Sequence, residues 1–407
     1  MIKSQNKISD VIQLDFQYIK NAIKQINIKT VLRQTDILYL AICLALSVFG
    51  IIMVSSATFS GDAFLSRDAK VMILATCMGL FAALVISFID YDIILKLWPL
   101  VGAACVVVML GLFWLGVSPE GRSDAFSWYK IGSLYFQPSE IVKIGFIITF
   151  SYHLSKAKND ISSLKNVFFL CAHALIPIVL VVATGDMGSA LIFILMFIGM
   201  MFAAGVHWLY FPAGALAVLA ASPVIWLKVF DDIQRNRILA LFNPEAYPTE
   251  IYQQNQARKA IINGGFSGMG LFEGELSHST LLPERQNDMI FSVVCEETGF
   301  IGAFILILLF TLFAVRIVKV GKRSGNFAAE MMSYGVAFMI LSQVIINIGM
   351  CTRLLPVIGI TLPFISAGGS SVVCLYLAIG LVLSIYRSSS DIGYQDFRYA
   401  RMARSYN

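Results

Sequence analysis

Four carboxylates lie in one stretch of 20 residues, 281–300, which reads LLPERQNDMIFSVVCEETGF. The stretch begins as a polar loop and turns into a long apolar segment. An ionisable side chain in hydrocarbon costs at least about 2.5 kcal/mol, so these carboxylates need a structural or chemical reason. The charged residues are Glu284, Asp288, Glu296 and Glu297, with Arg285 as the local counter-charge.

Asp288 is the carboxylate best placed for catalysis, because it falls where the polar loop meets the apolar segment. A lipid-linked polar substrate could reach it there, and a carboxylate can remove a proton from a hydroxyl if its site excludes water. The alternative is that Asp288 only caps the following helix. Glu296 and Glu297 lie about 12 Å deeper by helix rise. They point to different faces, so one would pair within the bundle and the other with a cap or a neighbour.

Two other sites place charge among apolar residues. Glu140 and Lys143, in FQPSEIVKIGF, are three residues apart and share one helix face, with Glu on the favourable N-terminal side. They form either a structural ion pair or the charged wall of a substrate channel. Asp186, in ATGDMGSAL, is predicted to cap the next helix. Together, Asp288, Glu140 and Lys143 predict an outward-facing polar cavity. Asp186 would also line this cavity if it does not serve only as a helix cap.

The elements that position these residues are predicted to be membrane helices. The 407-residue chain is 58% hydrophobic and 14% charged, with a mean hydropathy of +0.77, whereas soluble domains are about a quarter charged. The single cysteines and scattered histidines show no metal-ligand spacing, so no metal site is predicted. A net charge of +5 without a dense basic stripe argues against a nucleic-acid partner. The composition therefore predicts an all-α polytopic membrane protein.

Ten apolar stretches are long enough to cross a membrane, and we expect ten transmembrane helices. With a cytoplasmic N-terminus, Lys and Arg gather in the loops of one side, which requires an even number of spans. The chain is thus predicted to be a multi-pass protein with both termini in the cytoplasm. The expected spans are 37–57, 70–89, 97–116, 138–155, 166–184, 188–205, 207–228, 289–315, 331–350 and 368–386.

The predicted organisation has three parts: a cytoplasmic amphipathic segment, 1–36, the ten-helix domain, 37–386, and a cytoplasmic tail, 387–407. The first part is expected either to lie on the inner leaflet or to dock a partner. Between the seventh and eighth helices lies a large extracellular loop, 229–288. It is predicted to hold a helix over 251–262, followed by glycines that form flexible turns. Residues 351–367 are too short and too proline-rich to cross, so we expect a re-entrant or interfacial segment.

Three motifs resemble those of the SEDS proteins of cell shape, elongation, division and sporulation. They are FQPSEIVK, YQQNQARKAIINGGFSGMGLFEG…LLPERQNDMIFSVVCEETGFIG and LLPVIGITLPFISAGGSS, and they occur in that family's order. The resemblance implies a bacterial plasma-membrane peptidoglycan glycosyltransferase that polymerises lipid II at the outer face. It also implies a class B penicillin-binding protein as partner, with other elongation or division proteins.

The family's catalytic aspartate falls on Asp288. The resemblance implies that Asp288 is the general base for the acceptor hydroxyl, which displaces undecaprenyl pyrophosphate with inversion. Charge logic suggests that basic side chains or a divalent cation, Mg or Mn, stabilise this leaving group. The candidate substrate-binding residues in and near these motifs are Glu140, Lys143, Arg237, Gln253, Gln256, Arg258, Glu296 and Ser370.

Several functional alternatives remain open at this point. A lipid II flippase would also use intramembrane charges, and a scaffold would need no chemistry. Within the family, GLFEGE resembles the elongation branch, and the division and sporulation branches are the alternatives. Ser127 precedes Trp128 where the family usually has arginine, which weakens any phosphate-binding role for that loop.

Overall fold

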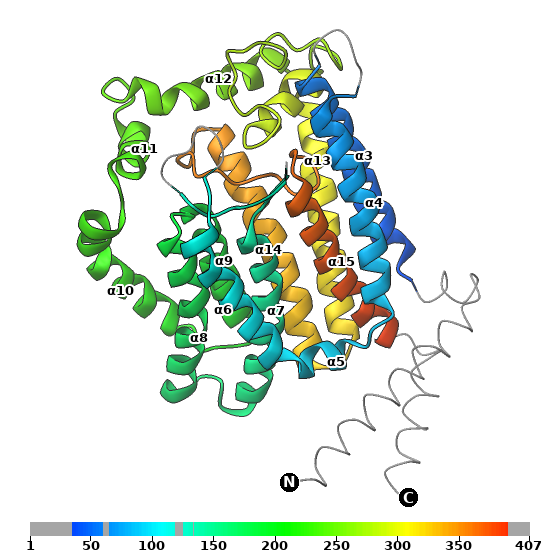
Figure 1. Cartoon of the computed structure of the whole chain (residues 1–407), viewed down its shortest axis with the longest axis vertical. Coiled ribbons are helices and arrows are strands. Elements are labelled where there is room, and N and C mark those ends of the chain that lie inside the picture. Colours follow the sequence, from blue (N-terminus) through cyan, green and yellow to red (C-terminus); the bar gives the residue numbers. More distant parts are fainter. Residues whose placement is uncertain (1–34, 60–64, 119–124, 133, 390–407) are drawn as a thin grey trace, which may run out of the picture.

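The computed structural model describes residues 35–59, 65–118, 125–132 and 134–389. They form a bundle of long helices with one short antiparallel hairpin (Figure 1). The elements of the first half are α3 (Ile37–Ala57), α4 (Arg67–Ser87), α5 (Tyr91–Lys96), α6 (Trp98–Leu115), β1 (Tyr129–Ile131), β2 (Leu134–Phe136), α7 (Pro138–Ala157), η1 (Lys158–Asp160), α8 (Leu164–Ala183) and α9 (Met187–Ala203). Those of the second half are α10 (Tyr210–Val224), η2 (Ile225–Val229), α11 (Asp232–Phe242), α12 (Pro248–Gly264), α13 (Ile290–Arg323), α14 (Phe327–Cys351) and α15 (Gly369–Ser389).

Each of the ten predicted spans is a helix in the structure, which confirms the all-α membrane fold. Among the described residues, eight helices are long and apolar enough to cross a membrane. The other two predicted spans are α9, an apolar helix of 17 residues, and α7, which carries Glu140, Lys143 and Lys156. Two of these charged residues, Glu140 and Lys143, belong to the site described below.

Short polar side chains fix where several helices begin. Asp36 accepts a hydrogen bond from the amide of Tyr39 at the start of α3, and Ser66 does the same for Ala69 in α4. Asn326 caps α14. A capping side chain satisfies one of the amides that the first helical turn leaves free. These caps mark the helix starts more sharply than hydropathy can.

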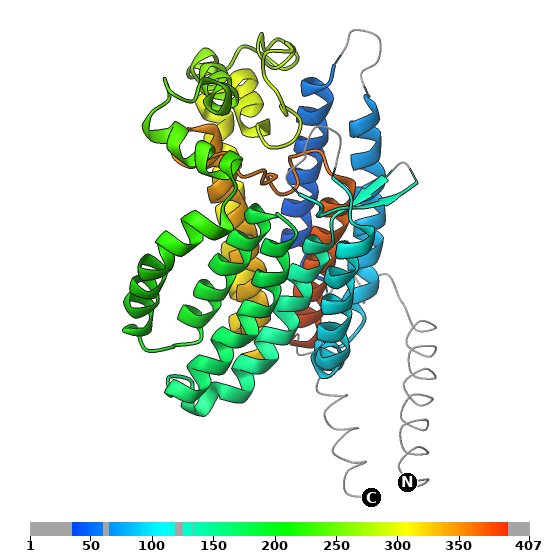
Figure 2. The same cartoon turned by 60° about the vertical axis from the view of Figure 1, so that its left-hand side comes forward.

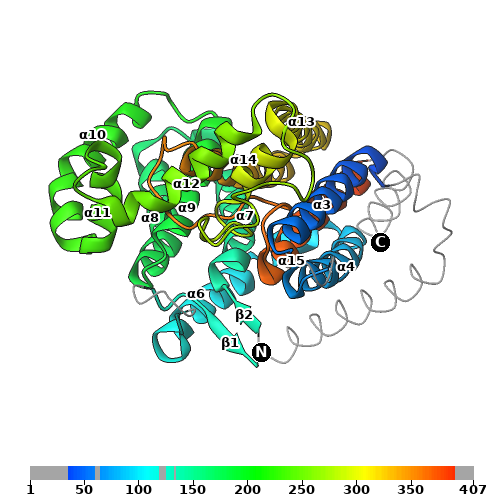
Figure 3. The same ribbon diagram turned by 90° about the horizontal axis from the view of Figure 1, so that it is seen from above.

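The helices with the largest share of buried residues are α14 and α7, which lie beside each other near the middle of the bundle (Figure 3). Helices α4 and α15 pack closely, because a Cβ added to Gly79 would lie 2.8 Å from the Tyr376 side chain and one added to Gly380 would lie 2.9 Å from the Ala83 backbone. The Tyr376 hydroxyl is 2.8 Å from the hydroxyl of Ser47 on α3. By contrast, no residue of α10 is buried in the chain.

The bundle has two unlike ends. We call the end that carries α11, α12 and residues 265–289 the loop end, and the end where α3 begins and α15 finishes the terminal end (Figures 1 and 2). At the terminal end, Arg316 of α13 binds the buried Asp36 through Nε, at 2.6 Å. The amphipathic segment predicted within 1–36, and most of the predicted tail, lie outside the described residues.

The loop end confirms two expectations about irregular segments. The helix predicted over 251–262 is α12, which starts earlier and ends at Gly264. Residues 352–368 leave α14 and return to α15 without forming a helix, so they do not cross the bundle. Both segments lie against the start of α13, where Asp288 is found.

Candidate active site

Asp288 lies just before the first turn of α13, on a segment that the rest of the chain holds at its backbone. The carbonyls of three consecutive residues, 286–288, each accept a hydrogen bond from a distant part of the sequence. The donors are, in order, the amide of Ala367 at 2.8 Å, the hydroxyl of Ser366 at 2.7 Å and Nδ2 of Asn347 at 2.8 Å. The approach of the chain to α13 is therefore fixed from α14 and from the 352–368 segment.

The structure encloses Asp288 more than the sequence suggested. The residue is 4% exposed, whereas the charges predicted an open, outward-facing cavity. The Asp288 carboxylate is therefore largely shielded from solvent in this structure. The carboxylate also precedes the N-terminus of α13, where the helix dipole stabilises negative charge.

Glu140 and Lys143 form the predicted ion pair on one face of α7. The Lys143 Nζ atom is 2.8 Å from Glu140 Oε1, and the two side chains are 1% and 11% exposed. Glu140 lines a cavity of about 20 Å³ together with Gln343 and Ser366, which is room for about one water molecule. Ser366 also binds the carbonyl preceding Asp288, so the ion pair and the clamped segment share a neighbour.

Asp186 has the predicted capping role and a second role that the sequence did not reveal. Its Oδ1 atom accepts from the amide of Ser189 at 2.9 Å, which caps α9. Its Oδ2 atom accepts from Nε2 of Gln137 at 2.7 Å and from the hydroxyl of Ser139 at 3.0 Å. These two residues begin the motif that contains Glu140. Asp186 therefore ties the start of α7, the helix that carries the ion pair, to α9.

The span predicted over 289–315 corresponds to α13, and this helix is broken at Gly299, whose φ and ψ are 65° and −166°. Residues 265–270 fill the break with four backbone hydrogen bonds. They are Met269 N to Glu296 O, Gly270 N to Glu297 O, Phe300 N to Gly265 O, and Ile301 N to Phe266 O, at 2.9–3.2 Å. The loop is thereby joined to α13 through main-chain hydrogen bonds on both sides of the break.

The glycines of this junction form turns, as the sequence predicted, with positive φ at Gly265, Gly268 and Gly270, but two glycines are also tightly packed. A Cβ added to Gly264 would lie 1.9 Å from the carbonyl oxygen of Cys295, and one added to Gly268 would lie 2.2 Å from that of Glu297. Both positions are packed against the backbone of α13. They are glycine because nothing larger fits.

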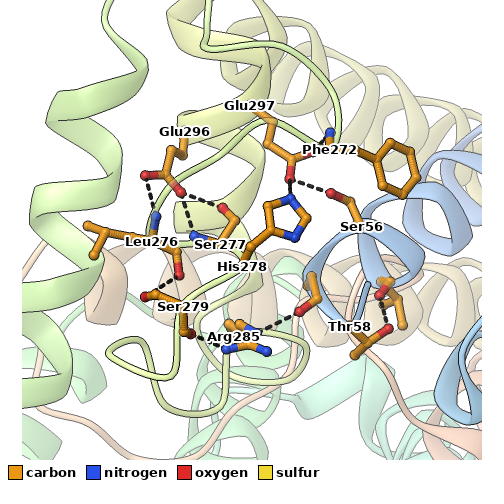
Figure 4. Close-up of polar contacts among 12 residues, drawn as sticks. Ser56, Thr58, Phe272, Leu276, Ser277, His278, Ser279, Arg285, Glu296 and Glu297 are labelled. Carbon is orange, nitrogen blue, oxygen red and sulfur yellow. Dashed lines mark hydrogen bonds and ion pairs between the residues drawn. The ribbon is translucent and has the colours of Figure 1, made fainter. Parts of the chain in front are cut away.

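The two adjacent glutamates at the break anchor the loop in different directions, as their helix positions predicted (Figure 4). Glu296 accepts from the amide of Leu276 at 3.0 Å, and from the amide and hydroxyl of Ser277 at 2.7 Å and 2.5 Å. Its side-chain contacts thus lie within the loop, which supports an anchoring role rather than substrate binding. Glu297 accepts from the hydroxyl of Ser56 on α3 and from the amide of Phe272.

His278 and Arg285 complete the attachment of the loop to α3 (Figure 4). The Nε2 atom of His278 is 3.6 Å from Oε1 of Glu297. Arg285 donates through Nε to the carbonyl of Ala57, the last residue of α3, at 2.6 Å, and through Nη1 to the carbonyl of Ser279. Arg285, which the sequence suggested as a counter-charge, therefore binds backbone carbonyls.

The junction at His278 should make stability depend on pH. Burial and then Arg285 lower the pKa of His278, against an opposing effect of Glu296; Glu297 is the other charged neighbour. The unfolded chain would then take up this proton at a higher pH than the folded chain, so stability is lost as pH falls below the ordinary value of about 6.5. We expect the melting temperature to fall about 1–3 °C further between pH 7 and pH 5 in the parent than in His278→Gln. Equal pH profiles in detergent would contradict this role.

Two other candidate substrate-binding residues make backbone contacts at the loop end. Gln253 donates to the carbonyl of Pro283 at 3.2 Å, and Arg237 approaches the carbonyl of Val357 at 3.5 Å. Gln256 is buried, Arg258 is exposed and Ser370 is half-buried. Their roles stay predictions. Lys143 and Glu140 are the candidates that the structure connects with the Asp288 segment, through the cavity that Ser366 also lines.

Sequence reasoning missed three residues that hold the site. Asn347 and Ser366 bind the segment of Asp288. Gln254, adjacent to the predicted Gln253, donates to the carbonyls of Met350 and Leu355 at 2.8 Å and 2.7 Å. One signal was available, because Asn347 is a polar residue near the end of a predicted span, where an unpartnered amide would be costly.

Comparisons with known proteins agree with this architecture. The family described as "Cell cycle protein", which groups FtsW, RodA and SpoVE, matches residues 36–391. Peptidoglycan glycosyltransferase MrdB of Escherichia coli K12 is 31% identical over 350 residues, which cover 85% of this chain and 92% of that protein. A probable peptidoglycan glycosyltransferase FtsW of Geobacter sulfurreducens (strain DL-1 / KN400) is 33% identical over 372 residues, covering 88% and 97%.

Solved structures confirm the fold. A chain of a peptidoglycan synthase complex, described as coordinating polymerization and crosslinking, matches with a TM-score of 0.75 at 24% identity, over 88% of this chain and 99% of that chain. The rod shape determining protein RodA of Thermus thermophilus matches with a TM-score of 0.66 at 22% identity, covering 88% and 98%. The arrangement of the helices is therefore one that is already known.

Proposed function

Because the chain belongs to the FtsW, RodA and SpoVE family of cell cycle proteins, we propose that it is a peptidoglycan glycosyltransferase. Its substrate would be lipid II, a disaccharide-pentapeptide carried on undecaprenyl pyrophosphate. The observation that carries the proposal is Asp288, held by its backbone at the start of α13 and linked through Ser366 to the buried Glu140–Lys143 pair. The names of relatives at 31% and 33% identity support the same activity.

In this reaction Asp288 acts as the general base. Its carboxylate takes the proton from the 4-hydroxyl of the acceptor N-acetylglucosamine, and that oxygen forms a bond to the anomeric carbon of the donor N-acetylmuramic acid. The bond from this carbon to the pyrophosphate oxygen breaks, the pyrophosphate leaves with the electron pair, and the configuration inverts. Enclosure of Asp288 serves this step, because a base that is shielded from water competes better for the sugar proton.

The departing pyrophosphate needs positive charge, and among the described residues Lys143 is the only buried Lys or Arg. Its described partner, Glu140, occupies one of three N–H donors. Arg237 and Arg258 at the loop end are further candidates. A divalent cation is a separate prediction. The described residues hold no cluster of three or more His, Cys, Asp or Glu side chains that could bind an ion, so such a cation would enter with the pyrophosphate.

We place the loop end at the outer face of the bacterial plasma membrane, with both termini in the cytoplasm. Basic residues gather at the terminal end, as expected for a cytoplasmic side; they include Lys156, Lys158, Lys165, Arg316, Lys319, Lys322, Arg323 and Arg387. A partner of the class B penicillin-binding type would crosslink the strands there. We propose the elongation branch and a role in cell shape from GLFEGE, although relatives of two branches are about equally identical.

The test supplies lipid II to the purified protein together with a class B penicillin-binding partner. Formation of glycan polymer is the expected result. The buried Glu140–Lys143 pair would equally suit a translocation path, so the same preparation is placed in vesicles. Scrambling of lipid II between leaflets without any polymer would favour a flippase, and neither activity would favour a scaffold.

Exchanging the two charges of α7 separates a structural pair from a substrate-binding one. In Glu140→Lys combined with Lys143→Glu, the ion pair can re-form on the same helix face, so we expect near-parent abundance in the membrane. The cation has moved by about one turn, so polymerisation should fall about 10²-fold or more. The initial rate of polymer formation and the melting temperature are measured together. Parent-like activity in the exchanged protein would show that the pair is structural only.

A further inference from the structure

We propose that Asn347 is a positioning residue that sets the direction in which Asp288 presents its carboxylate; this inference rests on the proposed function. Asn347 lies near the end of α14 and is 0% exposed. Its Nδ2 atom donates to the carbonyl of Asp288 at 2.8 Å and to the carbonyl of Ile360 at 2.7 Å. One amide group therefore ties together α14, the start of α13 and the 352–368 segment.

The neighbours of Asn347 settle the orientation of its amide. Turning the group over would place Oδ1 against two carbonyl oxygens, which are acceptors only. With Nδ2 in that place, both of its N–H bonds are used. The Oδ1 atom is buried and has no hydrogen-bond partner in the described structure. A buried acceptor without a partner is costly. The two hydrogen bonds that Nδ2 donates, to the carbonyls of Asp288 and Ile360, offset this cost.

The contact falls on the backbone of the catalytic residue itself. The other described donor to the carbonyl of Asp288 is the thiol of Cys351, one turn further along α14, at 3.6 Å, and a thiol is a weak donor. Only Cα and Cβ separate this carbonyl from the carboxylate. Rotation of the peptide would therefore swing the carboxylate away from the acceptor hydroxyl, and a misplacement of about 1 Å can lower a rate by about 10²-fold.

The discriminating variant is Asn347→Asp, which keeps the shape of the side chain but replaces the two-proton donor. Ser333→Ala is the matched control, because Ser333 is a buried polar residue of the same helix whose hydroxyl has no hydrogen-bond partner in the described structure. We expect Asn347→Asp to lower kcat for lipid II polymerisation about 10²-fold with KM changed less than about threefold. Ser333→Ala should keep both constants.

A pH profile separates positioning from simple loss of structure. The carboxyl group of Asn347→Asp can donate one hydrogen bond when it is protonated. Its activity relative to the parent at the same pH should therefore recover as the pH is lowered. A variant damaged only in its packing would show no such recovery.

A second measurement does not depend on activity. Carbodiimide labelling of Asp288, read by mass spectrometry, should rise severalfold in Asn347→Asp and stay at the parent level in Ser333→Ala. Parent-like kcat together with parent-like labelling would overturn the proposal. If the parent makes no polymer but labelling still rises in Asn347→Asp, the positioning contact stands and the proposed function is the part that fails.

Discussion

Asp288→Asn should reduce glycan polymerisation by about 10²–10⁴-fold, the usual contribution of a general base, without changing the amount of protein in the membrane. The substitution keeps the size and shape of the side chain but removes the group that accepts the sugar proton. The described contacts that fix the segment go to backbone carbonyls of residues 286–288, and an amide side chain leaves those carbonyls in place. The measurement is the initial rate of polymer formation from lipid II with the penicillin-binding partner present.

The matched control is Glu275→Gln, which neutralises an exposed carboxylate in the same loop. It should polymerise like the parent, because the loop is anchored by Glu296 and Glu297 instead. If Asp288→Asn polymerises as fast as the parent, Asp288 is not the base. A melting temperature close to that of the parent is required in both variants, since a fall in activity from unfolding would carry no information about chemistry.

The sequence predicted the helices well because their signal is local. An apolar stretch of about 20 residues identifies a span without any knowledge of its neighbours, and helix spacing alone placed Glu140 and Lys143 on one face. Asp186 as a cap was equally local, because Asp accepts from the amides that follow it. Asp288 was singled out by its position at a boundary between polar and apolar sequence, and then by a family resemblance.

What the sequence did not predict are contacts between residues far apart along the chain. Asn347 binds a residue 59 positions away, Ser366 one that is 79 positions away, and Glu297 meets Ser56 across 241 positions. Periodicity shows which face a side chain occupies, but not which helix lies opposite. The packing of Gly264 and Gly268 could not be predicted for the same reason, since the composition suits a turn and only the neighbouring carbonyls of α13 show that no side chain fits there.

Gly299→Ala should be among the most destabilising single changes in the chain, lowering the free energy of unfolding by about 2–5 kcal/mol. Two independent effects combine at this residue. Its φ of 65° and ψ of −166° belong to a region that is almost closed to residues with a Cβ. In addition, the new Cβ would lie 2.3 Å from the amide nitrogen of Gly268 and 2.6 Å from the carbonyl oxygen of Phe266.

The consequence should reach the active site, because the break in α13 is where the loop is attached. Separating residues 265–270 from α13 would leave four backbone groups of α13 without their hydrogen-bond partners. It would also loosen residues 271–288, the segment that leads from this junction to Asp288. Gly214→Ala in α10 is the matched control, since a Cβ at Gly214 meets nothing within 4 Å and alanine favours a helix. It should leave the melting temperature unchanged or raise it slightly. If Gly299→Ala and Gly214→Ala both have the melting temperature of the parent, the contacts at Gly299 do not hold the loop against α13.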